Sequence, residues 1–564
     1  MNSSINIKIG GKAGEGIKVT GLILSKIFSR SGFSIFSYDE YPSLVRGGHN
    51  TFQVFAGKEK VYSQHRKLDI LIALDDETIR MHEDELSKES LVLYDPQRVT
   101  TPTKAVAVEI PWAKLAEDAG GMAIMSNMVS LGAICCLCSL DIQVLYEIIV
   151  DTFSDKGSNV VEANKKAAEA GFNYIKQQFN ELKIGLEKPQ EKEQIVLTGN
   201  EAISVGAIAG GLKYYAAYPM TPATSILHTL AAQDRNFSIV VNHTENEVGA
   251  INSAIGAAAA GVRTMTASAG GGFSLMVEAL GFAGIGEVPV VIVISMRPGP
   301  ATGLPTWTGQ GDMKFAINAS QDEFPRLVFT PGDIQECFEL TRKALELSEK
   351  YQMPALILVD KVLSESYQST TPFENLVKNK RYGFASGGLY KEYRRYKLTD
   401  TGVSPRPVLG QVNRASLIAN SYEHGEDSLV TEDPKERVQQ MDKRLQKLET
   451  VKQDLWELPL YGDKEAGTVI VGFGSTMGSV REALKELENT SYLHFNYVWP
   501  FPKKQVTKVL KAAKRVICVE GNKLGQLESL IREQTGIEMA ASLRRYDGRP
   551  FYPEDIVTWI RNLK

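Results

Sequence analysis

Short apolar runs alternate with amphipathic stretches along most of this 564-residue chain. The runs at 288–295 (V-P-V-V-I-V-I-S) and 355–360 (A-L-I-L-V-D) are typical of buried strands, and stretches with helical spacing separate such runs. This alternation predicts an α/β protein whose central part is a doubly wound parallel sheet with helices on both faces.

The length exceeds what one hydrophobic core normally supports, so the chain should contain several domains. Changes in patterning suggest where they end. The expected segments are a first α/β domain at 1–182, a charged linker at 183–196, a central α/β domain at 197–363, an irregular arm with one helix at 364–464, and a C-terminal α/β domain at 465–564. Within the arm, we expect a helix from Pro434 to Leu455, and we expect Arg394 and Arg395 to form a solvated or interface face.

Composition and charge reduce the number of functions that this chain could have. The net charge of −4 gives no reason to expect a nucleic acid or another polyanion as partner. No uncharged apolar run reaches the ~18 residues of a membrane span, and the first ten residues lead into a strand without the apolar core of a signal peptide. We therefore expect a cytoplasmic protein that does not interact with membranes.

The five cysteines fit a reducing compartment. Cys135, Cys136 and Cys138 share the apolar segment G-A-I-C-C-L-C-S-L. Metal sites usually space thiols as C-x-x-C within turns, so small buried helix residues are the favoured interpretation here. Cys337 and Cys518 are expected to be isolated core residues.

The stretch from Tyr215 to Asp312 carries the candidate chemistry. Each of its expected strands ends in a turn rich in Gly, Pro, Ser or Thr, and a helix follows. In open parallel sheets such turns gather at the carboxyl ends of the strands, where ligands bind. The polar residues at these turns are Thr221, Glu247, Arg297 and Thr302.

Three further glycine-containing turns allow two interpretations each. Gly10 to Ile17 (G-G-K-A-G-E-G-I) joins a strand to a helix and could bind a phosphate or simply pack the helix closely. Arg46-Gly47-Gly48-His49 could face a ligand or form a polar hairpin turn. Gly472, Gly474 and Ser475 could hold an anion or form a tight strand–helix turn.

Glu247 opens an Ala-rich helix, E-V-G-A-I-N-S-A-I-G-A-A-A-A-G. A carboxylate there could cap the helix, or it could hydrogen-bond the aminopyrimidine ring of thiamine diphosphate and help to activate that cofactor. The small-residue helix behind it favours the second role. The chain lacks a G-D-G followed by paired Asn, which would bind diphosphate and Mg²⁺, and also the C-x-x-C-x-x-C runs that hold iron–sulfur clusters. It can therefore hold at most half of a thiamine site.

Arg297 ends the apolar strand V-V-I-V-I-S-M. A buried guanidinium is costly unless it is paired, and either a carboxylate ligand or a structural Asp or Glu could pair it.

Together these motifs resemble the α subunit of 2-oxoacid:ferredoxin oxidoreductases, in the form that carries a fused N-terminal γ domain. The first domain is similar to the γ domain in G-G-K-A-G-E-G-I and E-Y-P-S-L-V-R-G-G-H. The central motifs that carry the resemblance are Y-P-M-T-P-A-T, E-N-E-V-G-A and M-R-P-G-P-A-T-G-L-P-T-W-T-G-Q-G-D. Residues 391–425 resemble the 2-oxoglutarate branch. Met220 in place of Ile, and Pro298 in place of Gly, depart from the family pattern.

The resemblance implies a role for each candidate. Glu247 would contact the thiamine pyrimidine as catalytic and cofactor-binding residue; Thr221 and Arg297 would bind the 2-oxo-carboxylate end of the substrate; Thr302 and Thr306 would line its pocket. No metal ligand is expected on this chain. A β subunit would bring the diphosphate and Mg²⁺ site and a [4Fe–4S] cluster, and an (αβ)2 heterotetramer is expected. The C-terminal domain would be transketolase-C-like.

The implied reaction converts a 2-oxoacid, with 2-oxoglutarate expected, and coenzyme A to acyl-CoA and CO₂ while reducing ferredoxin. Two alternatives stay open at this point. One is a subunit of a non-redox thiamine diphosphate decarboxylase or transketolase-like enzyme. The other is a non-catalytic nucleotide-binding protein that uses the glycine turns.

Overall fold

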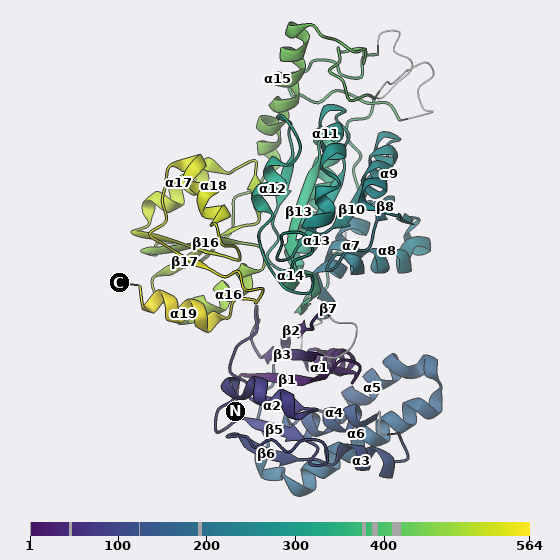
Figure 1. Cartoon of the computed structure of the whole chain (residues 1–564), viewed down its shortest axis with the longest axis vertical. Coiled ribbons are helices and arrows are strands. Elements are labelled where there is room, and N and C mark those ends of the chain that lie inside the picture. The colour runs from purple at the N-terminus through teal and green to yellow at the C-terminus, as the bar shows by residue number, and fades with distance from the viewer. Residues whose placement is uncertain are drawn as a thin grey trace. The chain divides into compact units, whose positions relative to one another are not determined.

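The computed structural model describes residues 2–43, 48–122, 125–189, 194–374, 379–385, 393–408 and 419–563. Contacts divide the chain into two compact units (Figure 1). The first contains Met1–Leu197, Glu365–Phe373 and Phe551–Lys564, and the second contains Thr198–Ser364 and Glu374–Pro550. The expected domain boundaries remain a prediction, but the α/β architecture with mainly parallel sheets is confirmed.

The first unit is built on an eight-stranded sheet. Its first four strands in spatial order run parallel, and β3, β2 and β14 then continue it with antiparallel pairings. The order is β6 (Val106–Glu109), β5 (Leu91–Tyr94), β4 (Ile70–Ala73), β1 (Ser4–Lys12), β3 (His49–Gly57), β2 (Ser34–Glu40), β14 (Tyr367–Thr370) and β7 (Ile195–Thr198). Strand β7 thus begins in the expected linker and ends in the expected central domain, and β14 lies inside the expected arm.

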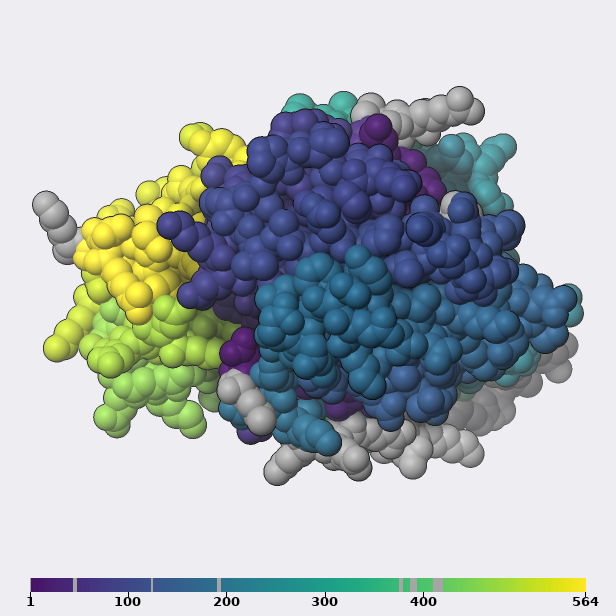
Figure 2. Space-filling view, turned by 90° about the horizontal axis from the view of Figure 1, so that it is seen from below, coloured from purple at the N-terminus to yellow at the C-terminus, as the bar shows by residue number. Residues whose placement is uncertain are grey.

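Helix α4 is the core helix of the first unit. Almost all its side chains are buried, and α6 packs against it so closely that a Cβ on Gly132 would lie 1.8 Å from the carbonyl oxygen of Ala168. Residues near 160–180, which include most of α6, are prominent on the face shown in Figure 2. The helices of this unit are α1 (Ile17–Arg30), α2 (Asp76–His82), α3 (Trp112–Asp118), α4 (Ser126–Leu137), α5 (Ile142–Phe153), α6 (Ser158–Gln178) and α19 (Pro553–Arg561).

The cysteine prediction is confirmed. Cys135 and Cys136 lie within α4 and Cys138 follows it; all three are buried, and burial raises the pKa of the Cys135 thiol to about 12. Cys337 and Cys518 are also buried. Thiols held protonated in this way neither ligate metals nor react readily.

The glycines of the 10–17 turn let the chain approach its neighbours closely. Gly16 has φ +79°, and a Cβ on it would lie 2.6 Å from the Asn127 amide nitrogen. Close packing is therefore sufficient to explain these glycines, and phosphate binding there stays a prediction. In the R-G-G-H segment, Arg46 and Gly47 lie outside the described residues, while Gly48 has φ +84° and His49 begins β3.

The second unit contains the expected doubly wound sheet. Six of its seven strands are parallel, and only β18 runs antiparallel to its neighbour. The order is β18 (Tyr497–Trp499), β12 (Leu327–Phe329), β13 (Ala355–Asp360), β11 (Val291–Met296), β10 (Thr264–Ser268), β8 (Tyr214–Ala217) and β9 (Val240–His243).

Helices cover both faces of this sheet. Helix α7 packs against α8 and α13, and α9 packs against α11. The right-handed connection that is general for parallel strands accounts for two sets of helices on opposite faces. Gly206 permits the tight contact of α7 with α13, because a Cβ there would lie 2.4 Å from the Phe338 carbonyl oxygen. The helices are α7 (Gly199–Ala209), α8 (Thr224–Phe237), α9 (Glu247–Ala259), α10 (Gly270–Ser274), α11 (Val277–Ile285), α12 (Met313–Asn318), α13 (Ile334–Tyr351) and α14 (Lys361–Glu365).

A five-stranded sheet forms the C-terminal part of the second unit (Figure 1). Its order is β15 (Leu460–Gly462), β17 (Thr490–Phe495), β16 (Thr468–Phe473), β19 (Arg515–Glu520) and β20 (Ala541–Arg544). All its strands are parallel except β15, and its helices are α16 (Thr476–Ala483), α17 (Lys503–Ala512) and α18 (Gln526–Thr535).

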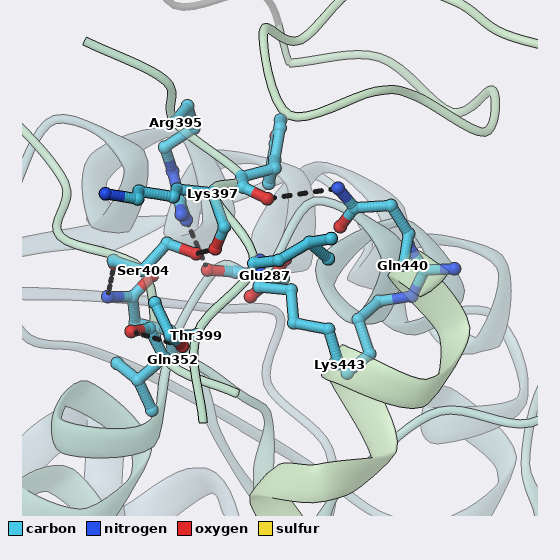
Figure 3. A network of polar contacts seen from close by, with 12 residues as sticks. Glu287, Gln352, Arg395, Lys397, Thr399, Ser404, Gln440 and Lys443 are labelled. Carbon is cyan, nitrogen blue, oxygen red and sulfur yellow. Dashed lines mark hydrogen bonds and ion pairs between the residues drawn. The ribbon is translucent and has the colours of Figure 1, made fainter. Parts of the chain in front are cut away.

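The described part of the arm is anchored by a buried carboxylate, that of Glu287 (Figure 3). Helix α15 (Pro434–Thr450) directs Lys443 and Lys447 to its two oxygens, and Arg395 donates to its backbone carbonyl at 3.0 Å. Burial alone would raise the pKa of Glu287, but the two ammonium groups outweigh it and hold the pKa below its usual range. The expectation that Arg395 belongs to a solvated or interface face is therefore wrong, whereas Arg394 is exposed and pairs with Glu426.

Candidate active site

Glu247 is the first residue of α9, directly beyond the carboxyl end of β9. Its side chain is 3% exposed. The neighbouring Asn246 caps the helix, because its side-chain oxygen accepts the Gly249 N–H at 2.8 Å. A capping role is therefore already filled, and the Glu247 carboxylate is free for another purpose.

The surroundings of the Glu247 carboxylate are sparse in polar partners. Ser268, at the end of β10, donates to Oε1 at 3.4 Å, and no ion pair to Glu247 is present in the described part of the chain. Helix α10 covers it through Gly272, where a Cβ would lie 2.5 Å from Oε1. A buried carboxylate without a cation is unfavourable unless a ligand supplies a donor. These surroundings leave the Glu247 carboxylate able to accept a hydrogen bond from the aminopyrimidine half of thiamine diphosphate.

Arg297 connects the turn after β11 to the turn after β8. It follows β11, and its Nη1 donates to the carbonyl oxygen of Thr221 at 2.7 Å, while Nη2 contacts the sulfur of Met220 at 3.5 Å. The turn contributed by β8 contains a cis peptide bond between Thr221 and Pro222. A guanidinium has five N–H donors, so three of them remain available to a ligand carboxylate.

The 297–312 loop carries the two remaining candidates. Thr306 is 5% exposed, and its hydroxyl has no hydrogen-bond partner among the described residues. A buried hydroxyl without a partner in the protein fits a site where a bound ligand supplies the hydrogen bond. Thr302 is exposed. It lies in a turn closed by the hydrogen bond from Leu304 N–H to the Pro298 carbonyl oxygen at 2.9 Å, so the Pro298 departure is compatible with a closed loop.

Asp312 is a site residue that the sequence reasoning missed. Its carboxylate packs against α10, because a Cβ on Gly270 would be 2.4 Å from the Asp312 Oδ2. Burial raises the pKa of Asp312 to about 6, and the positive charge of Arg297 opposes that rise. The signal was present in the sequence, because a partly buried Arg297 favours a countercharge and Asp312 is the acidic residue of its loop.

Helix α10 is the common floor of the candidate site. It contacts Glu247 through Gly272 and Asp312 through Gly270, while the carbonyl oxygen of Ala301 would be 3.7 Å from a Cβ on Gly271. The structure therefore brings the predicted Glu247 and the 297–312 loop to one place. Thr221 and Arg297 join them through their direct hydrogen bond.

The C-terminal sheet fixes the far end of the same loop. Gln310 accepts the Gly521 N–H at 2.8 Å and donates to the Phe473 carbonyl oxygen at 2.9 Å. The Thr308 N–H donates to the Gly548 carbonyl oxygen at 3.1 Å, and the guanidinium of Arg549 stacks on Trp307. These contacts position the loop from outside the central domain.

The 472–475 turn already donates a backbone hydrogen bond to a carboxylate of this chain. The buried carboxylate of Asp360 accepts the Ser475 N–H at 3.3 Å, and a Cβ on Gly474 would lie 2.8 Å from the Gln310 amide nitrogen. The observed geometry thus favours the tight-turn interpretation of these glycines.

Three family models match successive parts of the chain. Residues 6–174 match pyruvate ferredoxin/flavodoxin oxidoreductase, residues 205–443 the thiamine diphosphate-binding domain of pyruvate flavodoxin/ferredoxin oxidoreductase, and residues 466–556 core domain II of pyruvate:ferredoxin oxidoreductase. The central match contains every residue of the candidate site.

Individual relatives agree with these models. A 2-oxoacid:ferredoxin oxidoreductase subunit alpha of Sulfolobus sp is 33% identical over 97% of this chain and 95% of its own length. The 2-oxoglutarate synthase subunit KorA of Methanothermobacter thermautotrophicus is 30% identical over 65% of this chain and 98% of its own.

A solved structure is similar over the full length. The 2-oxoglutarate:ferredoxin oxidoreductase of Magnetococcus marinus, determined with 2-oxoglutarate, coenzyme A and succinyl-CoA bound, has a TM-score of 0.94 and 31% identity. It aligns with 100% of this chain and 99% of that chain. The chain therefore belongs to the 2-oxoacid:ferredoxin oxidoreductase family, among its alpha subunits.

Proposed function

We propose that this chain, together with a β subunit, catalyses the coenzyme A-dependent oxidative decarboxylation of 2-oxoglutarate to succinyl-CoA and CO₂, with reduction of ferredoxin. The observation that carries the proposal is the buried Glu247 carboxylate, which neither caps its helix nor pairs with a cation in the described chain. It lies against the same short helix as the Arg297 loop.

Glu247 would hold the aminopyrimidine of thiamine diphosphate by a hydrogen bond from its carboxylate. When bound, this cofactor supplies the electron sink that decarboxylation of a 2-oxoacid needs. The β subunit would contribute the diphosphate and Mg²⁺ site and the [4Fe–4S] cluster. This division is supported by the absence of the G-D-G and clustered-cysteine motifs from the sequence.

Arg297 would bind the 2-oxo-carboxylate end of the substrate with its remaining donors, and Thr221, Thr302 and Thr306 would complete the pocket. A dicarboxylate needs a second cation. Arg263 is unsuitable, because it is buried and pairs with Glu349, and Arg235 lies exposed on α8. We therefore assign the second cation to the β subunit.

Two exposed apolar side chains close to the site support a covering partner. Val248, beside Glu247, is 46% exposed, and Leu275, directly after α10, is 56% exposed. Apolar groups around an incomplete site are typical of an interface core. We propose that the β subunit covers them in an (αβ)2 heterotetramer located in the cytoplasm. None of the described helices is long and apolar enough to cross a membrane.

Purification of the chain with and without its β subunit tests this division of labour. The isolated chain should be colourless, iron-free and inactive, and the complex should contain iron and reduce ferredoxin when a 2-oxoacid and coenzyme A are present. Visible absorbance from a cluster on the isolated chain would contradict the division. An active complex without iron would instead indicate a non-redox thiamine enzyme.

Gly272→Ala should impair cofactor binding, since the new Cβ would lie 2.0 Å from the Ser268 hydroxyl and 2.5 Å from Glu247 Oε1. Displacement of the carboxylate should weaken thiamine diphosphate binding by the complex by about tenfold or more, the scale of a lost hydrogen bond to a charged group. Gly271→Ala is the matched control, because its nearest neighbour would be 3.7 Å away. Equal cofactor dissociation constants for the two variants would argue against Glu247 as a cofactor ligand.

A further inference from the structure

We propose that Gln310 is a positioning residue for the 2-oxoacid: through this side chain, the C-terminal sheet holds Arg297 in the orientation that binds the substrate carboxylate. The C-terminal sheet would thus set the affinity for the substrate, although none of the candidate site residues belongs to it. The inference rests on the proposed function, because it assumes that Arg297 receives the 2-oxoacid carboxylate.

The side chain of Gln310 joins two sheets. The residue is 2% exposed, and both polar atoms of its side chain form hydrogen bonds. Its Nε2 donates to the carbonyl oxygen of Phe473 at 2.9 Å and to Oδ2 of Asp360 at 3.2 Å, and its Oε1 accepts the Gly521 N–H at 2.8 Å. Asp360 ends β13 of the central sheet, whereas Phe473 ends β16 and Gly521 follows β19 in the C-terminal sheet. Gln310 therefore connects the carboxyl ends of strands from both sheets.

Two glycines of the C-terminal sheet make room for this side chain. A Cβ on Gly521 would lie 3.1 Å from Cγ of Gln310, and a Cβ on Gly474 would lie 2.8 Å from its Nε2. Gly474 also has φ +60°, in the left-handed region that favours glycine. The glycine turn at 472–475 thus accommodates a side chain of the loop that carries the substrate-binding candidates.

Gly309 connects Gln310 to Arg297 by direct packing. A Cβ on Gly309 would lie 3.2 Å from the backbone nitrogen of Pro298 and 3.5 Å from the carbonyl carbon of Arg297, so the two ends of the loop pack back to back. The Nη1 of Arg297 in turn donates to the carbonyl oxygen of Thr221. Release of Gln310 would remove the support behind Arg297 and shift its guanidinium away from the substrate carboxylate.

Glu247 is positioned by different contacts. Ser268 of β10 donates to its Oε1 at 3.4 Å, and Gly272 of α10 covers it. Loss of the Gln310 hydrogen bonds should therefore impair recognition of the 2-oxoacid and spare the binding of thiamine diphosphate. This difference separates a positioning role from a general loss of stability, which would weaken the binding of both.

The test is Gln310→Met in the α–β complex. Methionine is unbranched like glutamine, but its thioether cannot replace the three side-chain hydrogen bonds. The KM for 2-oxoglutarate should rise, and kcat/KM should fall by about 10- to 100-fold, the scale of a small misplacement of substrate-binding groups. The competitive inhibition constant of glutarate, which has carboxylates but no keto group, should rise with KM. The dissociation constant of thiamine diphosphate should stay within about twofold of the wild-type value, as for a substitution outside its site.

Gln505→Met is the matched control. Gln505 lies on α17 beside the C-terminal sheet, donates to the Leu458 carbonyl oxygen at 2.8 Å and accepts the Leu458 N–H at 2.7 Å. Neither bond involves the 297–312 loop. The same chemical change there should leave the KM for 2-oxoglutarate unchanged even where the unfolding temperature of the complex falls.

Gly521→Ala gives a second approach if Gln310→Met does not assemble. Its methyl group would press on Gln310 from the C-terminal sheet and should raise the KM for 2-oxoglutarate in the same direction, by less. A wild-type KM and an unchanged glutarate inhibition constant in Gln310→Met, or equal losses of affinity for substrate and thiamine diphosphate, would overturn the inference. A wild-type complex inactive on every 2-oxoacid would instead overturn the proposed function.

Discussion

Replacing Glu247 by glutamine should reduce the turnover of the assembled complex by about 100-fold or more, the scale of a lost acid–base group. The side chain is 3% exposed and lies on the candidate site, and an amide cannot accept a proton as the carboxylate does. The fold should be preserved because Asn246, and not Glu247, caps α9. The measurement is kcat at saturating 2-oxoglutarate, coenzyme A and ferredoxin.

Glu245→Gln is the matched control for this variant. Glu245 is exposed two residues earlier, so the same chemical change there should leave kcat within about twofold, as expected for a surface substitution. Unfolding temperatures of both complexes should match the wild type. A Glu247→Gln complex with wild-type kcat would remove Glu247 from the catalytic machinery.

Arg297→Lys should lower kcat/KM for 2-oxoglutarate by about 10- to 100-fold although the charge is conserved. The guanidinium is held by the Thr221 carbonyl oxygen and contacts the Met220 sulfur, which leaves its other donors in a fixed orientation. A lysine ammonium has fewer donors and no planar fork, so it cannot both hold the turn and bind a carboxylate in two places. One lost charge-assisted hydrogen bond is worth roughly 1.5–3 kcal/mol, which sets this range.

Comparison of kcat/KM for 2-oxoglutarate, pyruvate and 2-oxoisovalerate checks the assignment. The losses should be of similar size for all three, because Arg297 binds the end that they share. Arg235→Lys, on the exposed surface of α8, is the control. Full activity and an unchanged ranking in the Arg297→Lys complex would exclude Arg297 from the site.

Periodicity and motifs were sufficient for much of this account. Buried runs such as 291–296 and 355–360 identified strands of the parallel sheet, because strands covered on both faces are apolar throughout. The turns that follow parallel strands meet at one edge of the sheet, so the sequence predicts that Glu247, Thr221 and Arg297 lie close together.

Long-range partners could not be predicted in the same way. The arm lacks periodicity, and nothing local indicates that Arg395 lies beside Glu287, more than 100 residues away in sequence. The hydrogen bonds of Gln310 to Gly521 and Phe473 likewise join segments that only the tertiary fold brings together. Asp312 was missed because its role depends on its place beside helix α10, which the loop sequence does not show.

The most direct test of the central claim is the stoichiometry of the reaction catalysed anaerobically by the α–β complex. With 2-oxoglutarate, coenzyme A and oxidised ferredoxin, one succinyl-CoA and one CO₂ should form for every two electrons that reach ferredoxin. Omission of coenzyme A or of this chain should abolish sustained turnover. Release of CO₂ with formation of an aldehyde and no reduction of ferredoxin, or the absence of any reaction with 2-oxoacids, would contradict the account.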